Sequence, residues 1–219
     1  MKKKHLKSLQ TVRKWLDSKK PLNDSLKNAF SLIEMSLNSL DDSDEKSEGR
    51  LPVPSEIADE PMTLALYSDG GCRGNPGPGA FAFVVQDHSG AVVTEGVEFE
   101  QLTTNNKMEL SGPIHGLKEL KNFLPQTGRD PLLTKIKVLT DSKYVVDGMK
   151  TWVAGWKARG WKKADNKTPE NIELWQELDQ LKNHFMQVEW VWVKGHAGHP
   201  QNEYCDRKAN EVMDANLSF

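Results

Sequence analysis

From position 62 onward, short apolar strands alternate with amphipathic helical segments, and this order restricts the fold more than any other feature. The first three strands are separated only by turn-rich loops, which predicts antiparallel pairing. The later strands are reached through helical segments, which predicts parallel pairing in an α/β domain. The expected strands cover 64–68, 80–86, 92–100, 135–140 and 188–193, and the expected helices cover 105–124, a short segment from 142, 169–185 and 202–216.

Residues 1–60 differ from the rest of the chain in charge. Positions 1–20 carry a formal charge of +7, and positions 41–60 carry −6. Apolar residues at helical spacing predict short helices on either side of Pro21, whereas the acidic stretch 39–61 contains three prolines and is typical of a linker. We therefore expect a helical or partly disordered extension (1–38), an acidic proline-containing linker (39–61) and a main domain (62–219). The extension is either a tail or an accessory module for nucleic acid or a protein partner.

Composition excludes several classes of protein. Two cysteines, Cys72 and Cys205, are too few for a disulfide-rich secreted scaffold or a four-cysteine zinc site. No apolar run approaches the roughly 18 residues of a membrane span, and no apolar stretch follows the basic start as in a secretory signal. A net charge of −2 excludes a uniformly basic surface but leaves room for a local basic patch. We expect a cytoplasmic protein that does not contact a membrane.

Four carboxylates occupy positions at which an α/β sheet gathers ligands. Asp69 ends the first strand and Asp141 ends the fourth, so their side chains would adjoin if these strands are neighbours. Glu109 lies about one turn into the first long helix, and Asp206 lies in the last helix. Such a cluster is costly unless cations neutralise it, and oxygen ligands suit Mg²⁺ or Mn²⁺. Taken singly, each carboxylate also fits an ordinary structural role, because an aspartate before two glycines is usually a turn residue.

Five segments stand in an order and spacing typical of one enzyme family. They are YSDGGCRGNPGPGAFAFVV, TTNNKMEL, LTDSKYVVDGMKTWVAGWKARGWKKAD, ELWQELD and WVWVKGHAGHPQNEYCDRKAN. Over about 63–216 the chain thus resembles a type 1 ribonuclease H of the bacterial kind. The resemblance implies a ribonuclease H-like fold, with a five-stranded mixed sheet (an antiparallel meander followed by parallel strands) flanked by helices. It also implies an endonuclease that hydrolyses the RNA strand of RNA–DNA hybrids and leaves 5′-phosphate and 3′-hydroxyl ends.

The resemblance implies an active site that uses two metal ions. Its metal-binding and catalytic carboxylates fall on Asp69, Glu109, Asp141 and Asp206. The family's mobile catalytic histidine falls on His196, in a glycine-flanked loop, whereas His199 is expected to be structural. Two Mg²⁺ ions, or Mn²⁺ in their place, would activate the attacking water and stabilise the leaving 3′-oxygen.

The resemblance also implies two surfaces that contact the hybrid. Minor-groove contacts fall on Cys72, Asn75, Asn105 and Asn106, because short polar groups there can recognise 2′-hydroxyls. Thr104 matches a residue that binds a DNA phosphate, and Lys143 stands where many bacterial relatives carry Gln. Segment 150–167 has a formal charge of +5 and matches a protrusion that grips the DNA strand. The contacts expected within it are Trp152, Trp156, Lys157, Arg159 and Lys162, although some of its tryptophans are expected in the core.

Two alternatives keep the fold and change the activity: a DNA-processing nuclease, and a non-catalytic protein that binds hybrids. No carboxylate of the implied set is missing, which argues against the second alternative. A monomer is expected.

One local feature of the first long helix departs from the family pattern. Pro113 follows Gly112 and lacks the amide hydrogen that would bond the carbonyl of Glu109. The sequence therefore predicts a kink or wide turn just after Glu109.

Overall fold

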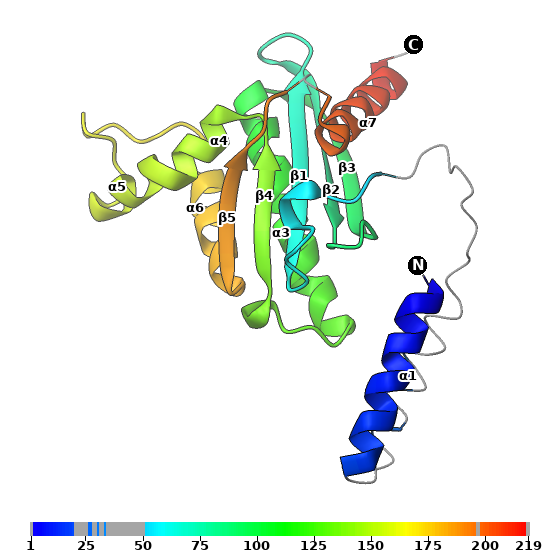
Figure 1. Cartoon of the computed structure of the whole chain (residues 1–219). Helices are drawn as coiled ribbons and strands as arrows, with labels where there is room; N and C mark the ends of the chain where they lie inside the picture. Colours follow the sequence, from blue (N-terminus) through cyan, green and yellow to red (C-terminus); the bar gives the residue numbers. More distant parts are fainter. Residues whose placement is uncertain are drawn as a thin grey trace. The chain divides into compact units, whose positions relative to one another are not determined.

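The computed structural model describes residues 2–19, 26, 27, 30, 33, 51–195 and 198–217. The chain forms two compact units, Met1–Arg50 and Leu51–Phe219. In the first unit, helix α1 (Lys2–Lys19) lies where the apolar spacing predicts a helix (Figure 1). Most of the second predicted helix and residues 39–50 of the predicted linker lie outside the described residues. Within the described part of the chain, no helix is long and apolar enough to span a bilayer.

The second unit is built on a five-stranded sheet with the strand order β3-β2-β1-β4-β5 (Figure 1). Strands β1 (Thr63–Cys72), β2 (Gly77–Gln86) and β3 (Val92–Thr103) form the antiparallel part. Strand β4 (Lys135–Thr140) pairs parallel to β1, and β5 (Gln187–Trp192) pairs parallel to β4. This mixed sheet confirms the predicted fold class.

The helices connect and cover these strands. They are α3 (Asn105–Gln126), α4 (Lys143–Asp147), a π-helical turn (Gly148–Trp152), α5 (Val153–Ala158), α6 (Ile172–Leu181) and α7 (Pro200–Leu217). Short 3₁₀ turns occupy Ser55–Ile57, Pro131–Leu133 and Lys182–His184. Helix α6 starts later than predicted because Asn171 before it adopts a left-handed conformation, with φ 53°.

Alternate residues of β1 point to two separate cores, as the period of a strand requires. Leu64 and Leu66 pack in the core beneath α3, α4 and α6, which cover one face of the sheet. Ala65 and Tyr67 pack in the core beneath α7, which covers β1, β2 and β3 on the other face. The sheet therefore holds α3 and α7 on opposite sides of the same strand.

Helix α3 is continuous through Gly112 and Pro113, so the wide turn predicted after Glu109 is wrong. A side chain at Gly112 would bring its Cβ to 2.9 Å from the Cβ of Ser68 in β1. The glycine therefore allows α3 to approach the sheet closely. Ten buried residues hold the helix against its neighbours, and this packing outweighs the local penalty of the proline.

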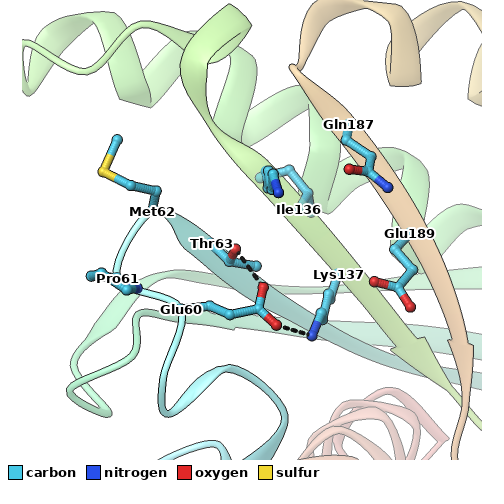
Figure 2. A pocket seen from close by; sticks show the side chains of 9 residues that line it. Glu60, Pro61, Met62, Thr63, Ile136, Lys137, Gln187 and Glu189 are labelled. Atoms are coloured by element: carbon cyan, nitrogen blue, oxygen red, sulfur yellow. Dashed lines mark hydrogen bonds and ion pairs between the residues drawn. The ribbon is translucent and has the colours of Figure 1, made fainter.

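Residues 51–61 pack on the second unit, although the sequence places them in the linker. We call Leu51–Pro61 the strap. Its Ile57 is 1% exposed and lies in the same core as α7, so the strap covers the α7 side of the sheet (Figure 1). Glu60 then fixes the end of the strap to the sheet, accepting hydrogen bonds from Thr63 (2.8 Å) and Lys137 (2.5 Å; Figure 2). The domain thus begins near residue 51.

Candidate active site

Three of the predicted carboxylates meet at one edge of the sheet. β1 and β4 are parallel neighbours, which confirms the arrangement required for Asp69 and Asp141 to adjoin. Together with Asp206 of α7, these two aspartates line a cavity of about 210 Å³. Because β1, the end of β4 and α7 each supply one carboxylate, the cavity depends on the whole fold of the second unit.

Glu109, the fourth carboxylate, projects from α3 beside this cavity. Its Oε2 accepts a hydrogen bond of 2.6 Å from the hydroxyl of Ser142, the residue that follows Asp141. Burial raises the pKa of Glu109; the Ser142 hydrogen bond opposes this shift, and the negative charge of Asp141 adds to it. The net shift is upward, so the ionised form of Glu109 is disfavoured next to its acidic neighbour.

Asp141 is held by residues that sequence reasoning did not single out. Asn202 of α7 donates to Oδ2 of Asp141 at 3.4 Å, and the indole of Trp192 donates to its backbone carbonyl at 3.0 Å. A Cβ at Gly195 would overlap Oδ2 of Asp141, so only glycine allows the backbone to approach there. The one sequence signal for these contacts is the glycine itself, which precedes the predicted catalytic loop.

The structure bears on the predicted role of only one of the two histidines in the last motif. His196 lies outside the described residues, so its predicted role stays a prediction. His199 contacts Glu56 of the strap at 2.7 Å, and its ring lies 5.3 Å from that of Tyr67. These contacts agree with the structural role expected for His199.

The donors at this edge suit a hard divalent cation. They are carboxylate oxygens, which are the ligands that Mg²⁺ prefers, and a cation would offset the negative charges that these side chains bring together. Asp69 accepts from the amide of Gly70 at 2.7 Å, and Asp206 accepts from Asn210 at 2.8 Å. Among the described residues, no three acidic, histidine or cysteine side chains are already close enough together to hold one ion.

The residues predicted to contact the minor groove lie around the start of α3. The side-chain oxygen of Asn105 accepts from the amide of Cys72 at 2.8 Å and from its thiol at 3.1 Å. The side-chain oxygen of Asn75 accepts from the amide of Asn105 at 3.4 Å. Asn106 follows in the first turn of α3, and Thr104 caps that helix by accepting from Lys107 at 3.4 Å. Hydrogen bonds join Cys72, Asn75 and Asn105, and Cys72 and Asn105 also line the carboxylate cavity. We call these three residues, together with Asn106 in the adjoining turn of α3, the polar ridge.

The basic, tryptophan-rich segment forms the part of the domain around α5, which projects beyond the edge of the sheet (Figure 1). A hollow of about 670 Å³ lies there, lined by Tyr144, Trp152, Trp156, Arg159 and Lys163, among others. Trp156 is 9% exposed and belongs to the core, whereas Trp152 is 38% exposed. Of the two tryptophans predicted to contact substrate, Trp152 therefore offers the larger accessible face.

Two predicted cationic contacts have partners within the protein. The ammonium of Lys157 lies 2.6 Å from Oδ2 of Asp179, a buried carboxylate that also pairs with Lys182 at 2.7 Å. Burial would raise the pKa of Asp179, but the hydrogen bonds from Lys157 and Lys182 more than offset this and lower it. Lys143 lies over the ring of Trp192, 5.1 Å from its centre. Arg159 lines the hollow and donates to the carbonyl of Lys162 at 3.2 Å, and the side chains of both residues are exposed.

Comparisons with known proteins agree with this geometry. The RNase H family model matches residues 61–214. A protein named Ribonuclease H from Nitrosomonas eutropha is 41% identical over 163 residues, which is 74% of this chain and 97% of that protein. Another from Ralstonia nicotianae is 46% identical over 152 residues, 69% of this chain and 91% of that protein.

The chain also resembles solved structures of ribonucleases H. The crystal structure of LC9-RNase H1, described as a type 1 RNase H with the type 2 active-site motif, has a TM-score of 0.59 and 35% identity, covering 75% of this chain and 74% of that one. LC11-RNase H1 in complex with an RNA/DNA hybrid has a TM-score of 0.54 and 27% identity, covering 70% of this chain and 99% of that one. Strand β1 continues to Cys72, so Asp69 lies inside it and not at its end as predicted, whereas Asp141 directly follows β4. This chain, with its mixed sheet and these carboxylates, belongs to the ribonuclease H family.

Proposed function

We propose that this protein is a ribonuclease H that hydrolyses the RNA strand of RNA–DNA hybrids. The observation that carries the proposal is the convergence of Asp69, Asp141 and Asp206 on one cavity, with Glu109 beside it. A related structure contains an RNA/DNA hybrid, which supports the substrate class. All four carboxylates come from one chain, so a monomer is sufficient for the reaction.

Members of this family generally use divalent metal ions, and we assign the metal ligands here to the four carboxylates. When bound, two Mg²⁺ ions, or Mn²⁺ in their place, supply an activated water and neutralise the charge that develops at the phosphate. The protein's own contribution is to orient the carboxylates. Ser142 fixes Glu109, while Asn202 and the indole of Trp192 fix the side chain and the carbonyl of Asp141.

Proton transfer is assigned to His196 on the basis of the motif. Its loop is bounded by Gly195, which allows close approach to Asp141, and by Gly198, which has a φ of +82°. A histidine near its ordinary pKa can accept and release a proton at neutral pH, or assist the departure of product. The assignment predicts that His196→Ala slows turnover without abolishing it.

We assign the RNA strand to the polar ridge and the DNA strand to the basic segment. Side chains and backbone groups of the ridge can bond 2′-hydroxyls, which only RNA carries. Thr104, Trp152, Arg159 and Lys162 would contact the DNA strand, mainly through phosphates and without reading sequence. This division explains how the enzyme selects a hybrid over either pure duplex.

The direct test measures cleavage of three labelled duplexes of one sequence: RNA–DNA, DNA–DNA and RNA–RNA, each with and without Mg²⁺. We expect Mg²⁺-dependent cleavage of the RNA strand of the hybrid alone, with 5′-phosphate ends on the products. Cleavage of DNA–DNA would favour a DNA-processing nuclease of this fold. Tight hybrid binding without cleavage would favour the non-catalytic alternative.

A further inference from the structure

The strap begins ten residues before the part of the chain that matches the family model, yet it is bonded into the domain. The backbone carbonyl of Pro52 accepts hydrogen bonds from two side chains, Gln201 at 2.9 Å and Gln86 at 3.3 Å. Both glutamines are buried, and they also bond each other at 3.0 Å. The strap therefore satisfies polar groups that would otherwise be buried without a full set of partners.

Glu56 of the strap contacts three residues in the rest of the domain. One of its carboxylate oxygens lies 2.7 Å from Nε2 of His199, and the other accepts from the hydroxyl of Tyr67 at 3.0 Å. Its backbone carbonyl accepts from Lys137 at 2.8 Å. Burial would raise the pKa of Glu56, but the hydrogen bonds to His199, to its own backbone amide and to Tyr67 together lower it.

The end of the strap is anchored without the side chain of Glu56, although Lys137 bonds both Glu60 and the backbone carbonyl of Glu56. Figure 2 shows Glu60 turned toward Lys137 and Thr63, beside a hollow of about 400 Å³ that β4 and β5 also line. The strap is therefore fixed to the sheet at Glu60 and to α7 at Glu56 and Pro52. Rigid attachment to the sheet allows it to act as a brace for α7.

The strap contacts α7 at its beginning. His199 and Gln201 flank Pro200, the first residue of that helix. Within the next two turns α7 carries Asn202, which bonds Asp141, and Asp206, which lines the carboxylate cavity. Any displacement of the first turn of α7 would move both contacts together.

We propose that Glu56 is a positioning residue of the ribonuclease H active site: by holding His199, it fixes the start of α7. The activity part of this proposal rests on the proposed function. The strap itself never touches the reacting atoms, because it lies on the α7 side of the sheet and contacts α7 rather than the cavity. Its effect should therefore appear in turnover and not in hybrid affinity.

The test uses four variants of the full-length protein: Glu56→Ala, Glu56→Gln, Ile57→Ala and Asp59→Asn. Asp59 is exposed on the same strap, so Asp59→Asn is a matched control for the loss of one negative charge. Ile57→Ala removes buried strap packing but keeps the carboxylate that holds His199. Hybrid cleavage is measured as kcat and KM well below each melting temperature, and hydrogen exchange is measured over residues 198–206.

We expect Glu56→Ala to lower kcat about tenfold, the usual effect of losing a group that orients a ligand-bearing element, with KM changed less than about twofold. Glu56→Gln should restore most of kcat, because its amide oxygen can still accept from His199. Exchange at the start of α7 should become faster in Glu56→Ala alone. Ile57→Ala should lower the melting temperature and keep kcat near the wild-type value.

The proposal is overturned if Glu56→Ala matches Asp59→Asn in kcat, or if kcat follows the melting temperature across all variants. Should Glu56→Ala fail to fold, His199→Asn breaks the same contact from the other side and must give the same loss. Combining Glu56→Gln with His199→Asn must then add little to the loss in His199→Asn alone. If the wild-type protein cleaves no hybrid, the proposed function fails, and the exchange measurement alone then decides whether Glu56 holds α7.

Discussion

Ser142 links the carboxylate of Glu109 to the start of α4, because its hydroxyl has two roles at once. It donates to Glu109 at 2.6 Å and accepts from the amide of Val145 at 3.2 Å, which caps α4. The hydroxyl cannot turn away from Glu109 without disturbing that cap. A residue that is not among the predicted site residues thus sets the orientation of Glu109.

Ser142→Ala should therefore lower both activity and stability. Loss of the cap costs about 1 kcal/mol, and loss of the hydrogen bond that orients Glu109 should lower kcat about tenfold. Urea unfolding and steady-state hybrid cleavage measure the two effects separately. Ser142→Thr keeps the hydroxyl and should recover most of the activity; an active Ser142→Ala enzyme would show that Glu109 needs no such support.

The lowered pKa of Asp179 makes the free energy of unfolding depend on pH. Its pKa is lowered in the folded state, so its contribution is complete above the ordinary aspartate pKa of about 4 and is lost as the pH falls through the lower folded value. We expect the free energy of unfolding to decline below about pH 4. In Asp179→Asn, stability at pH 7 should fall by about 2 kcal/mol and this part of the acid dependence should disappear. An unchanged acid dependence in Asp179→Asn would assign it to other carboxylates.

At the scale of elements, the contact between α3 and β1 decides where Glu109 is held. Gly112→Ala should destabilise the protein by about 1–3 kcal/mol, because the added Cβ meets Ser68 at 2.9 Å. The gain in helix propensity from glycine to alanine, about 1 kcal/mol, acts in the opposite direction. Chemical denaturation gives the net value. A stabilised Gly112→Ala protein would mean that the glycine is tolerated and not required for packing.

We expect the segment around α5 to hold two kinds of cation: some that bind substrate and some that support the fold. Arg159→Ala combined with Lys162→Ala should weaken hybrid binding and reduce the slope of log affinity against log salt by about 1–2, with little change in stability. Lys157→Ala should instead lower the melting temperature, because Lys157 pairs with the buried Asp179. A double variant with an unchanged salt slope would show that this segment does not contact phosphates.

At the scale of the whole molecule, the fold of the catalytic domain could largely be predicted, because strand periodicity and short motifs can be recognised within short stretches of sequence. Strand periodicity places Asp69 and Asp141 where two predicted strands end, and β1 and β4 do pair in parallel, as the adjacency of these residues required. The strap was not predictable, since prolines interrupt its few apolar residues and remove any periodic pattern. Its bonds to α7 join residues about 140–150 positions apart in the chain, a separation that no local pattern reports.

Side-chain contacts between residues far apart in the sequence could also not be predicted from the sequence. The pairing of Lys157 with Asp179 depends on how α5 packs on α6, and the tight approach of Gly195 to Asp141 depends on a loop. The sequence identified Lys157 only as a cation and Gly195 only as a glycine. For the same reason the sequence could not show that Gly112 makes room for β1.

The central claim is that Asp69 belongs to a cavity of carboxylates that organises Mg²⁺-dependent cleavage of RNA in a hybrid. Asp69→Asn keeps the shape of the side chain and removes one negative charge, so the protein should stay folded. The decisive measurement compares the single-turnover rate of hybrid cleavage in wild type and Asp69→Asn over a range of Mg²⁺ concentrations, beside their melting temperatures. We expect a folded variant whose cleavage rate is at least about 10³-fold lower, with no recovery at high Mg²⁺. A folded Asp69→Asn protein that cleaves within about tenfold of wild type would contradict the account, because metal-organised catalysis could not then depend on this carboxylate.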